Sequence, residues 1–293
     1  MIKNQNKKTA LTLLLLQRRL YSKAKLWGSW RLTGVLLIGL TAPVVATLVP
    51  DLTVAVAVTS AVWIFLSRTI FASKEKKYAS KAATIQEEFD LMVYDMPSIG
   101  ERGQTLTLED RDDILGDTST FLAQINKERL KNWYPFDSKA DGTLSVAVAQ
   151  RANAVYTERL LRSSANALLI LTIMWLMVFV VVSLIQKISL ANFLLGIFLP
   201  LLPALLDNYE NWKSVRSAGN TRLNLAIEIQ DTIDDLSLNI DEKLMVWQNE
   251  LYNLRIVTPN IPNLVYKAAR KKNEKAMNAA ASNLIDTYNK RSR

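Results

Sequence analysis

The sequence predicts an all-α integral membrane protein, with four transmembrane helices arranged as two hairpins and with a cytoplasmic helical bundle. Four apolar segments of the 293-residue chain are long enough to cross a bilayer, which takes about 20 residues of helix. Mean hydropathy is +0.08 although 22% of the residues are charged, so charged and apolar residues must be segregated along the chain. In the polar remainder, apolar residues recur every three or four positions, as they do on one face of a helix.

The four spans are predicted at residues 32–49, 52–71, 166–185 and 188–206. Residues 50–51 and 186–187 are the only joints within each pair, and joints this short permit only tight helical hairpins. The chain therefore divides into an amphipathic N-terminal segment (1–31), a first hairpin (32–71), a helical insert (72–165), a second hairpin (166–206) and C-terminal helices (207–293).

Lys and Arg residues orient this topology. Eight precede the first span, fourteen lie from Arg68 to Arg162, thirteen follow the fourth span, and only Lys187 lies on the other side. Cytoplasmic loops carry the excess of positive charge, so both termini and the insert are predicted to be cytoplasmic. Four aromatic residues near the predicted inner interface are placed as an aromatic belt would be, namely Trp27, Trp30, Tyr209 and Trp212.

The composition argues against an enzyme. The chain has no Cys and no His, which excludes disulfides, thiolate or imidazole metal ligands, Cys nucleophiles and His general bases. It has no glycine-rich phosphate loop, and only nine glycines. We expect no catalytic residues, no metal and no cofactor. An acidic cluster at Asp231, Asp234, Asp235, Asp241 and Glu242 fits a solvated helix face better than a cation site.

Helices are predicted throughout the polar parts. The apolar run at residues 10–20 is too short for a signal sequence and lacks a cleavage site, so we expect an amphipathic helix on the membrane surface. A stripe from Tyr78 to Met96 predicts one helix, and Thr107 with Asp110 begins another that runs to about residue 131. An apolar seam at residues 229–254 predicts a long helix, and residues 264–290 a last, basic one. Whether these faces pair within one chain or in a homo-oligomer stays open.

Span two presents a face of mostly small or hydroxylated residues, Thr53, Ala57, Ser60 and Ser67, interrupted by Ile64. Such a face suits the wall of a narrow aqueous path in an oligomer, and equally suits close helix packing. In span four, Pro200 and Pro203 predict a kink, which is either a hinge for gating or a static bend.

Residues 144–161 form a predicted helix that continues directly into span three. A continuous helix is a mechanical link, because a displacement of its soluble half tilts or rotates the half above it. This stretch is therefore predicted to connect a soluble sensing part to the membrane.

Six motifs along the chain resemble the S-4TM family, whose members are four-transmembrane, pore-forming effectors of bacterial cyclic-nucleotide anti-phage (CBASS-like) systems. The motifs are "QNKKTALTLLLLQRRLYSKAK", "IQEEFDLMVYDMP", "KNWYP", "QRANAVYTERLLR", "LPLLPALLDNYENWK" and "IPNLVYKAARKKNEKAMN". The resemblance implies an oligomeric effector that disrupts the bacterial inner membrane when infection alters a cyclic-nucleotide signal, causing abortive infection. Some relatives carry a fused nucleotide-sensing SAVED domain, and we expect none here. We therefore expect the ligand to bind the bundle, or a sensor partner to gate it.

A basic and aromatic group of residues is the candidate site for a cyclic oligonucleotide. Guanidinium groups bind phosphate and aromatic rings stack on bases. The candidate residues are Trp133, Tyr134, Gln150, Arg151, Asn153 and Arg159. In the alternative interpretation, the arginines face lipid phosphates and the aromatic residues belong to the bundle core.

The expected function is thus a membrane effector without enzymatic activity that opens or disrupts the bilayer. A membrane-anchored scaffold that recruits a partner through its helices is the alternative. A secondary transporter is disfavoured, because four spans are few and no inverted repeat or intramembrane acid is evident. We expect the bilayer, further copies of the chain and a cyclic oligonucleotide or a sensor protein as partners, and neither DNA nor RNA.

Overall fold

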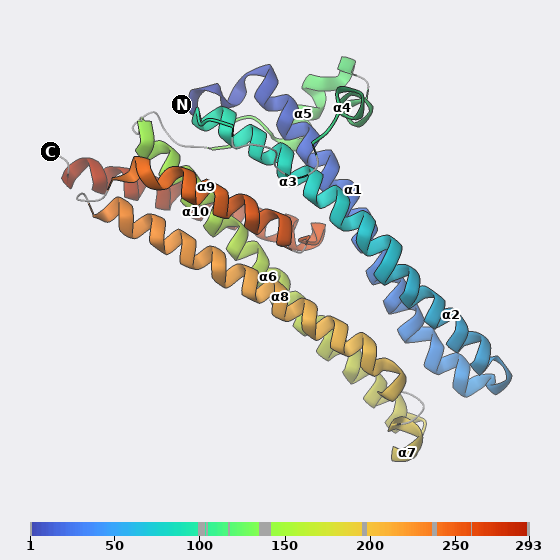
Figure 1. Cartoon of the computed structure of the whole chain (residues 1–293). Helices are drawn as coiled ribbons and strands as arrows, with labels where there is room; N and C mark the ends of the chain where they lie inside the picture. The colour runs from blue at the N-terminus through green and yellow to red at the C-terminus, as the bar shows by residue number, and fades with distance from the viewer. Residues whose placement is uncertain are drawn as a thin grey trace.

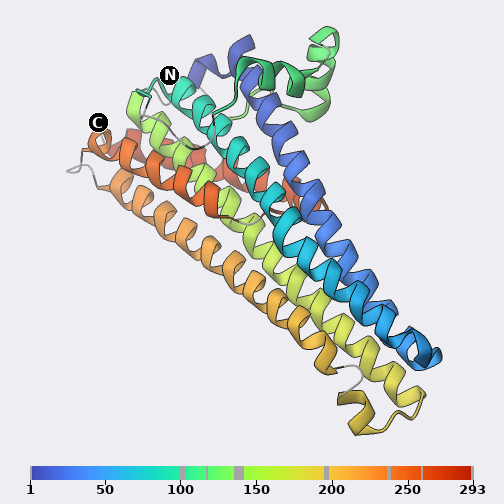
Figure 2. The same ribbon diagram turned by 45° about the vertical axis from the view of Figure 1, so that its right-hand side comes forward.

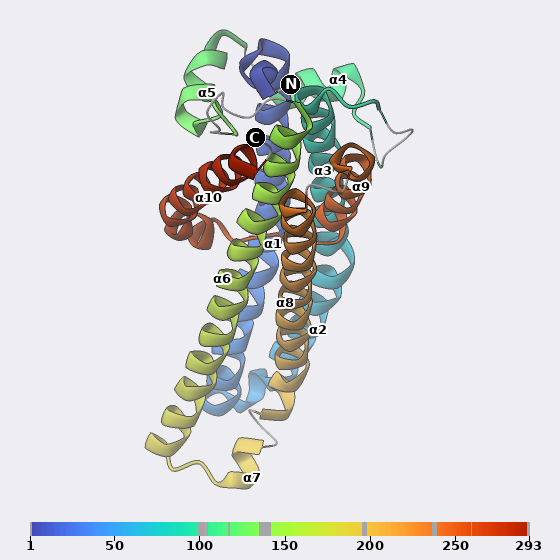
Figure 3. The same ribbon diagram turned by 90° about the vertical axis from the view of Figure 1, so that its left-hand side faces the viewer.

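The computed structural model describes residues 2–98, 103, 105–116, 118–134, 142–194, 198–235, 239–258 and 260–291. Every regular element in these ranges is helical, which confirms the all-α prediction. Two long helical hairpins have their closed ends at the lower end of the molecule, and both chain termini lie at the upper end (Figure 1). The same arrangement is visible after rotation (Figures 2 and 3).

The first hairpin consists of two antiparallel rods. Helix α1 (Lys8–Leu48) is followed by the short turn η2 (Pro50–Leu52) and by α2 (Thr53–Leu66). One π-helical turn, Ser67–Phe71, joins α2 without a break to α3 (Ala72–Tyr94), which packs along α1. π-helical turns are rare and concentrate at functional sites, and this one falls at the predicted inner end of span two.

The second hairpin confirms the predicted continuity of span three with the soluble part. Helix α6 (Gly142–Ile185) runs for 44 residues without interruption. The chain turns at Lys187, whose φ is 50°, forms the short α7 (Leu190–Phe193) and returns as α8 (Leu199–Asp234). Helix α8 packs against α6 along its length. The predicted fourth span, residues 188–206, covers α7 and the first residues of α8, and residues 195–197 between them lie outside the described set.

Two helices among the described residues are long and apolar enough to cross a membrane, Val54–Tyr94 and Gly142–Ile185. Only 6% and 11% of their most apolar 18-residue windows are buried within the chain. Apolar helices so little covered need lipid or another protein surface around them. Several side chains of α1 beyond Gly39, and residues 195–197, lie outside the described set, so the four-span topology remains a prediction.

The N-terminal apolar run occupies the core of the bundle, not a membrane surface, and that prediction was wrong. In α1, Ala10, Leu14 and Leu16 are almost completely buried. They belong to one hydrophobic cluster with Ile85 and Phe89 of α3. The run is apolar on several faces because neighbouring helices cover it on several sides, a situation that an amphipathic surface helix does not meet.

The C-terminal part contains two helices where the seam predicted one. Helix α8 ends at Asp234, and α9 (Ile240–Val257) begins after Asn239, whose side chain accepts a hydrogen bond from the Asp241 N–H at 3.1 Å. Such a cap begins a helix, and α9 packs against α3, α6 and α8. The last predicted helix is present as α10 (Asn263–Arg291).

The insert also contains two short helices in place of one. Helix α4 (Leu108–Leu115) begins at the predicted cap, where the Asp110 N–H donates to Thr107 Oγ1 at 3.1 Å. Gly116 ends it with a φ of 54°, which a residue with a side chain rarely adopts. The chain then continues through η4 (Thr118–Thr120) into α5 (Phe121–Glu128).

Removing the Thr107 cap is expected to loosen α4 alone. The change Thr107→Ala removes the oxygen that binds the Asp110 N–H, at a cost of about 1 kcal/mol. Amide hydrogen exchange in α4 should then be about fivefold faster. The change Thr105→Ala, two residues earlier and also exposed, is the control and should leave exchange unchanged. Equal rates in the two variants would contradict the assignment of this cap.

Candidate functional site

A cavity of about 470 Å³ lies in the bundle, the end of the molecule where the long helices meet α9 and α10. Its walls come from α1, α3, α6, α8, α9, α10, the loop after α5 and the loop between α9 and α10. Among its described lining residues, seven are cationic and one, Glu274, carries a carboxylate. The cationic residues are Arg18, Lys25, Arg129, Lys131, Arg222, Arg255 and Arg270. The excess of positive charge favours an anionic occupant.

Aromatic rings supply much of the remaining wall: Tyr21, Trp133, Tyr134, Tyr156 and Tyr266. Tyr266 lies at the centre of a group of cations. The charged groups of Arg18, Lys25 and Arg270 lie 5.3, 5.4 and 5.8 Å from its ring centroid, within the range of cation–π attraction. Flat rings beside cations are the combination that binds bases and phosphates.

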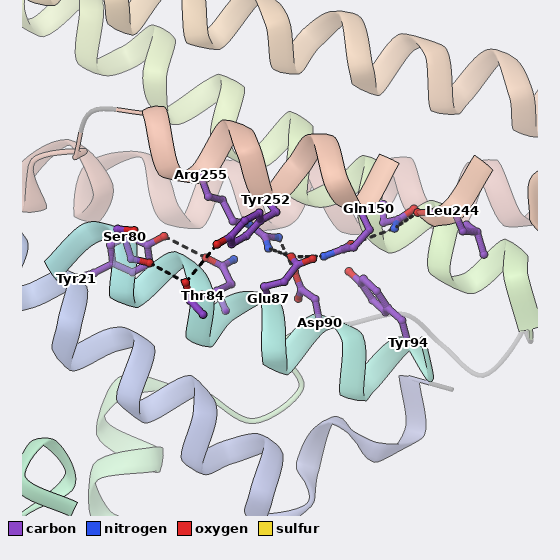
Figure 4. A network of polar contacts seen from close by, with 12 residues as sticks. Tyr21, Ser80, Thr84, Glu87, Asp90, Tyr94, Gln150, Leu244, Tyr252 and Arg255 are labelled. Carbon is purple, nitrogen blue, oxygen red and sulfur yellow. Dashed lines mark hydrogen bonds and ion pairs between the residues drawn. The ribbon is translucent and has the colours of Figure 1, made fainter. Parts of the chain in front are cut away.

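Arg255 of α9 belongs to a buried ion-pair network beside the cavity (Figure 4). Its guanidinium lies 3.2 Å from Glu87 Oε2 and 2.5 Å from Asp90 Oδ2, both on α3. The three side chains are only 5%, 2% and 0% exposed. Burial alone would lower the pKa of Arg255, but the charges of Asp90 and Glu87 outweigh burial and raise the pKa. This residue is thus a fixed cation neutralised by the protein.

Uncharged side chains extend the network to other helices. Gln248 of α9 donates to Glu87 at 2.7 Å, and Gln150 of α6 donates to Gln248 at 3.0 Å and to the Leu244 carbonyl at 2.9 Å. The hydroxyl of Tyr134 donates to Asp90 at 2.8 Å. Helices α3, α6 and α9 and the loop after α5 are therefore joined through one set of buried polar groups.

The loop that carries Trp133 and Tyr134 is held by the N-terminus of the chain. The side chain of Gln5 donates to the Tyr134 carbonyl at 3.0 Å and accepts from the Tyr134 N–H at 2.8 Å. A two-bond clamp of this kind replaces the partners that a loop backbone lacks. Burial raises the pKa of the Tyr134 hydroxyl well above its ordinary value, so this hydroxyl stays protonated and remains a donor.

Arg222 of α8 lines the same cavity but has a different environment. Its side chain is almost wholly enclosed, with 2% of the residue exposed. One guanidinium nitrogen donates to Thr258 Oγ1 at 2.8 Å, and Nε is buried without a partner in the described part of the chain. Burial, and then the positive charge of Arg255, lower the pKa of Arg222 to about 10.

Three of the six residues proposed from the sequence come together in this cavity, and three do not. Trp133, Tyr134 and Asn153 line it. Gln150 is fully buried in the network described above. Arg151 donates to Gln230 Oε1 of α8 at 2.7 Å, and Arg159 is exposed; neither lines the cavity.

The sequence analysis did not identify Arg222 and Arg255 as site residues. Both line the cavity, and Arg255 also belongs to the ion-pair network. A signal was present: Arg255 follows Leu251 by four residues, and Arg222 precedes Ile229 by seven, so both lie in register with buried apolar positions. A charge in a core register requires a partner or a ligand. Tyr156 and Tyr266 were missed because an aromatic residue at helical spacing usually indicates ordinary core.

The residues proposed for a pore wall do not share one environment. Ala57 is exposed, Ser60 is half-buried and donates back to the Val56 carbonyl at 2.7 Å, and Ser67 is buried in the π-helical turn. The side chain of Thr53 lies outside the described set. So do those of Pro200 and Pro203, although their backbone belongs to α8, with Pro200 in its first turn.

A chain of polar contacts connects this cavity with a second cavity between the two hairpins. Asn260, in the cavity wall, donates to Glu75 Oε1 at 3.0 Å, and Glu75 Oε2 accepts from Arg31 at 2.7 Å. Arg31 lines a second cavity of about 740 Å³, where Arg68 of the first hairpin pairs with Asp207 of the second. The two hairpins thus meet through charged groups at this level.

Comparison with known proteins places the chain in a family. The model of the SMODS-associating 4TM effector domain matches residues 1–284. A relative from Bacillus cereus, described as a probable CBASS effector molecule, is 24% identical over 227 residues, which are 75% of each chain. No solved structure matches the chain. Because the family model covers nearly the whole sequence, the protein belongs to the SMODS-associating 4TM effector domain family.

Proposed function

We propose that this protein is an inner-membrane effector of a CBASS-type antiviral defence that permeabilises the membrane as a homo-oligomer. A cyclic nucleotide, or a partner protein that senses one, acts on the bundle and changes the state of the spans. The family match and the related probable CBASS effector support the effector role.

One observation carries the connection between bundle and spans. Helices α1, α6 and α8, and the rod formed by α2 and α3, each run from the hairpin end of the molecule to the wall of the cavity. A ligand in the cavity therefore contacts both hairpins at once. A change in the separation of α1 and α8 at the cavity moves the same rigid helices in the lipid.

The apolar lower halves of the helices fit insertion. Side chains such as Val54 and Ile185 are 75% and 71% exposed. The charged pair Arg68 and Asp207 lies at the level where the apolar segments begin, and it joins one hairpin to the other. Separation of the hairpins there requires that this pair be broken or be satisfied by water.

Vesicle leakage tests the proposal. The full chain is reconstituted into vesicles of phosphatidylethanolamine and phosphatidylglycerol loaded with carboxyfluorescein, with and without cyclic di-AMP. We expect dye release whose rate differs between the two conditions, in whichever direction the nucleotide acts. Intact vesicles in both conditions, with folded protein present, would rule out the pore and leave the scaffold.

The face of span two gives a sharper prediction. If this face lines the path, the change Ser60→Leu should reduce dye release severalfold, because it replaces a half-buried hydroxyl by a bulky apolar group. The matched control is Val58→Leu, at a position 58% exposed on another face of the same helix. Release by the Ser60 variant equal to that of the control would show that the face packs instead.

A further inference from the structure

Two buried guanidinium groups beside one cavity differ in how their charge is balanced. Arg255 pairs with Glu87 and Asp90. For Arg222, by contrast, no ion pair is found among the described residues, and its one hydrogen bond there is to the neutral hydroxyl of Thr258. An enclosed guanidinium without an anion is costly, and native proteins seldom retain one without a use.

Arg222 is placed where an anion in the cavity could pair with its guanidinium. The side chain lines the cavity, and its Nε is buried and unsatisfied in the described chain. The guanidinium group is a planar fork whose paired N–H groups match two oxygens of a phosphate. With an anion in the cavity, the buried charge of Arg222 would be neutralised and its Nε would have a hydrogen-bond partner.

We infer that Arg222 anchors a phosphate group of a nucleotide-type ligand whose base lies among the rings of Trp133, Tyr156 and Tyr266. The inference deepens the function proposed above and depends on it for the class of ligand. Aromatic rings and cations both line the cavity, and its volume of about 470 Å³ lies within the usual range for small-molecule sites. The protein without ligand is then a charge-unbalanced state, which the ligand completes.

An anion bound at Arg222 would also affect the buried ion-pair network of Arg255. Arg255 lines the cavity beside Arg222 and holds Glu87 and Asp90 of α3. A phosphate on Arg222 attracts Arg255 as well and competes with the two carboxylates for it. Occupancy of the cavity therefore alters the attachment of α3, which belongs to the first hairpin, to α9.

Thermal unfolding and calorimetric titration of the full chain in detergent test the inference. The probes are cyclic di-AMP, AMP, adenosine, inorganic phosphate and dihexanoyl phosphatidic acid. We expect at least one adenine nucleotide to raise the melting temperature of the wild type. Adenosine, which has no charge, and phosphate, which has no ring, should bind at least tenfold more weakly. A response to the lipid phosphate alone would overturn the nucleotide assignment, as would no response to any phosphate.

The variant Arg222→Met separates an anchor from a structural residue. Without ligand it should melt higher than the wild type, by about 2–4 °C, because an unbalanced buried charge has been removed. With the nucleotide it should bind at least tenfold more weakly. The control Arg216→Met, an exposed position on the same helix, should leave both measurements unchanged. A lower melting temperature or undiminished binding in Arg222→Met would each refute the anchor.

A second variant and the choice of readout keep the two proposals separate. Arg222→Lys keeps the charge but not the fork, so it should bind with intermediate affinity. Binding is measured in detergent and leakage in vesicles. Protein that binds nucleotide but never leaks refutes only the pore, whereas leakage with no nucleotide binding refutes only the role of Arg222.

Discussion

Replacement of Arg255 by Met is expected to lower the melting temperature of the solubilised protein by about 6–10 °C. The change leaves Glu87 and Asp90 buried without their cation, and breaking a buried ion pair from one side costs about 3–5 kcal/mol. For a chain of this size each kcal/mol shifts the melting temperature by about 2 °C. Thermal unfolding followed by circular dichroism measures the effect.

Two controls identify the cause. The change Arg291→Met removes an exposed partner of Asp234 and should cost at most about 1 kcal/mol, because surface pairs contribute little. Adding Glu87→Gln and Asp90→Asn to the Arg255 variant should recover part of the loss, since no buried charge is then left unpaired. If Arg255→Met alone were as stable as the wild type, the network would have to be accessible to solvent.

The second large effect is expected in the first hairpin, from the addition of a single methyl group. At Gly34 of α1 a Cβ would overlap the indole ring of Trp63 of α2. The change Gly34→Ala should therefore force α1 and α2 apart or displace Trp63. Overpacking of this kind costs about 1–3 kcal/mol, and the melting temperature should fall by about 2–6 °C.

The same substitution elsewhere should have the opposite sign. At Gly219 of α8 an added Cβ would lie 3.7 Å from the Leu161 Cβ, an ordinary contact. Since Ala favours a helix over Gly by about 1 kcal/mol, Gly219→Ala should be neutral or slightly stabilising. A loss of stability in both variants, or in neither, would contradict the close approach of α1 and α2. Gly39, where a Cβ would overlap Trp175 of α6, tests the contact between hairpins in the same way.

Much of the fold could be predicted because its information is local. The predicted helix from residue 144 into the span at 166–185 is present as α6, Gly142–Ile185, and the predicted cap at Thr107 begins α4. The predicted helix bounds were wrong where a few residues interrupt a helix. Gly116 divides one predicted helix, and the Asn239 cap begins α9 inside what the apolar seam presented as one helix. Periodicity continues through such breaks because both helices use the same core.

About half of the candidate site could be predicted. Trp133, Tyr134 and Asn153 were found because a basic and aromatic stretch stands out in the sequence, and all three line the cavity. Arg151 and Arg159 were chosen for their positive charge, but neither lines the cavity. Arg151 donates to Gln230 of α8, and Arg159 is exposed. Composition specifies which groups are present, whereas the direction of a side chain depends on the helix that packs beside it.

The sequence by itself determined that the chain is helical, that apolar rods continue into polar ones, and that positive charge gathers in the polar part. Only the tertiary structure decided which buried cation is neutralised and which is not. Arg255 meets Asp90, a residue 165 positions away, while Arg222 meets neutral groups and a cavity. The reason is physical: a helical pattern fixes the face on which a side chain lies, but the energy of a buried charge depends on groups that other helices bring to it.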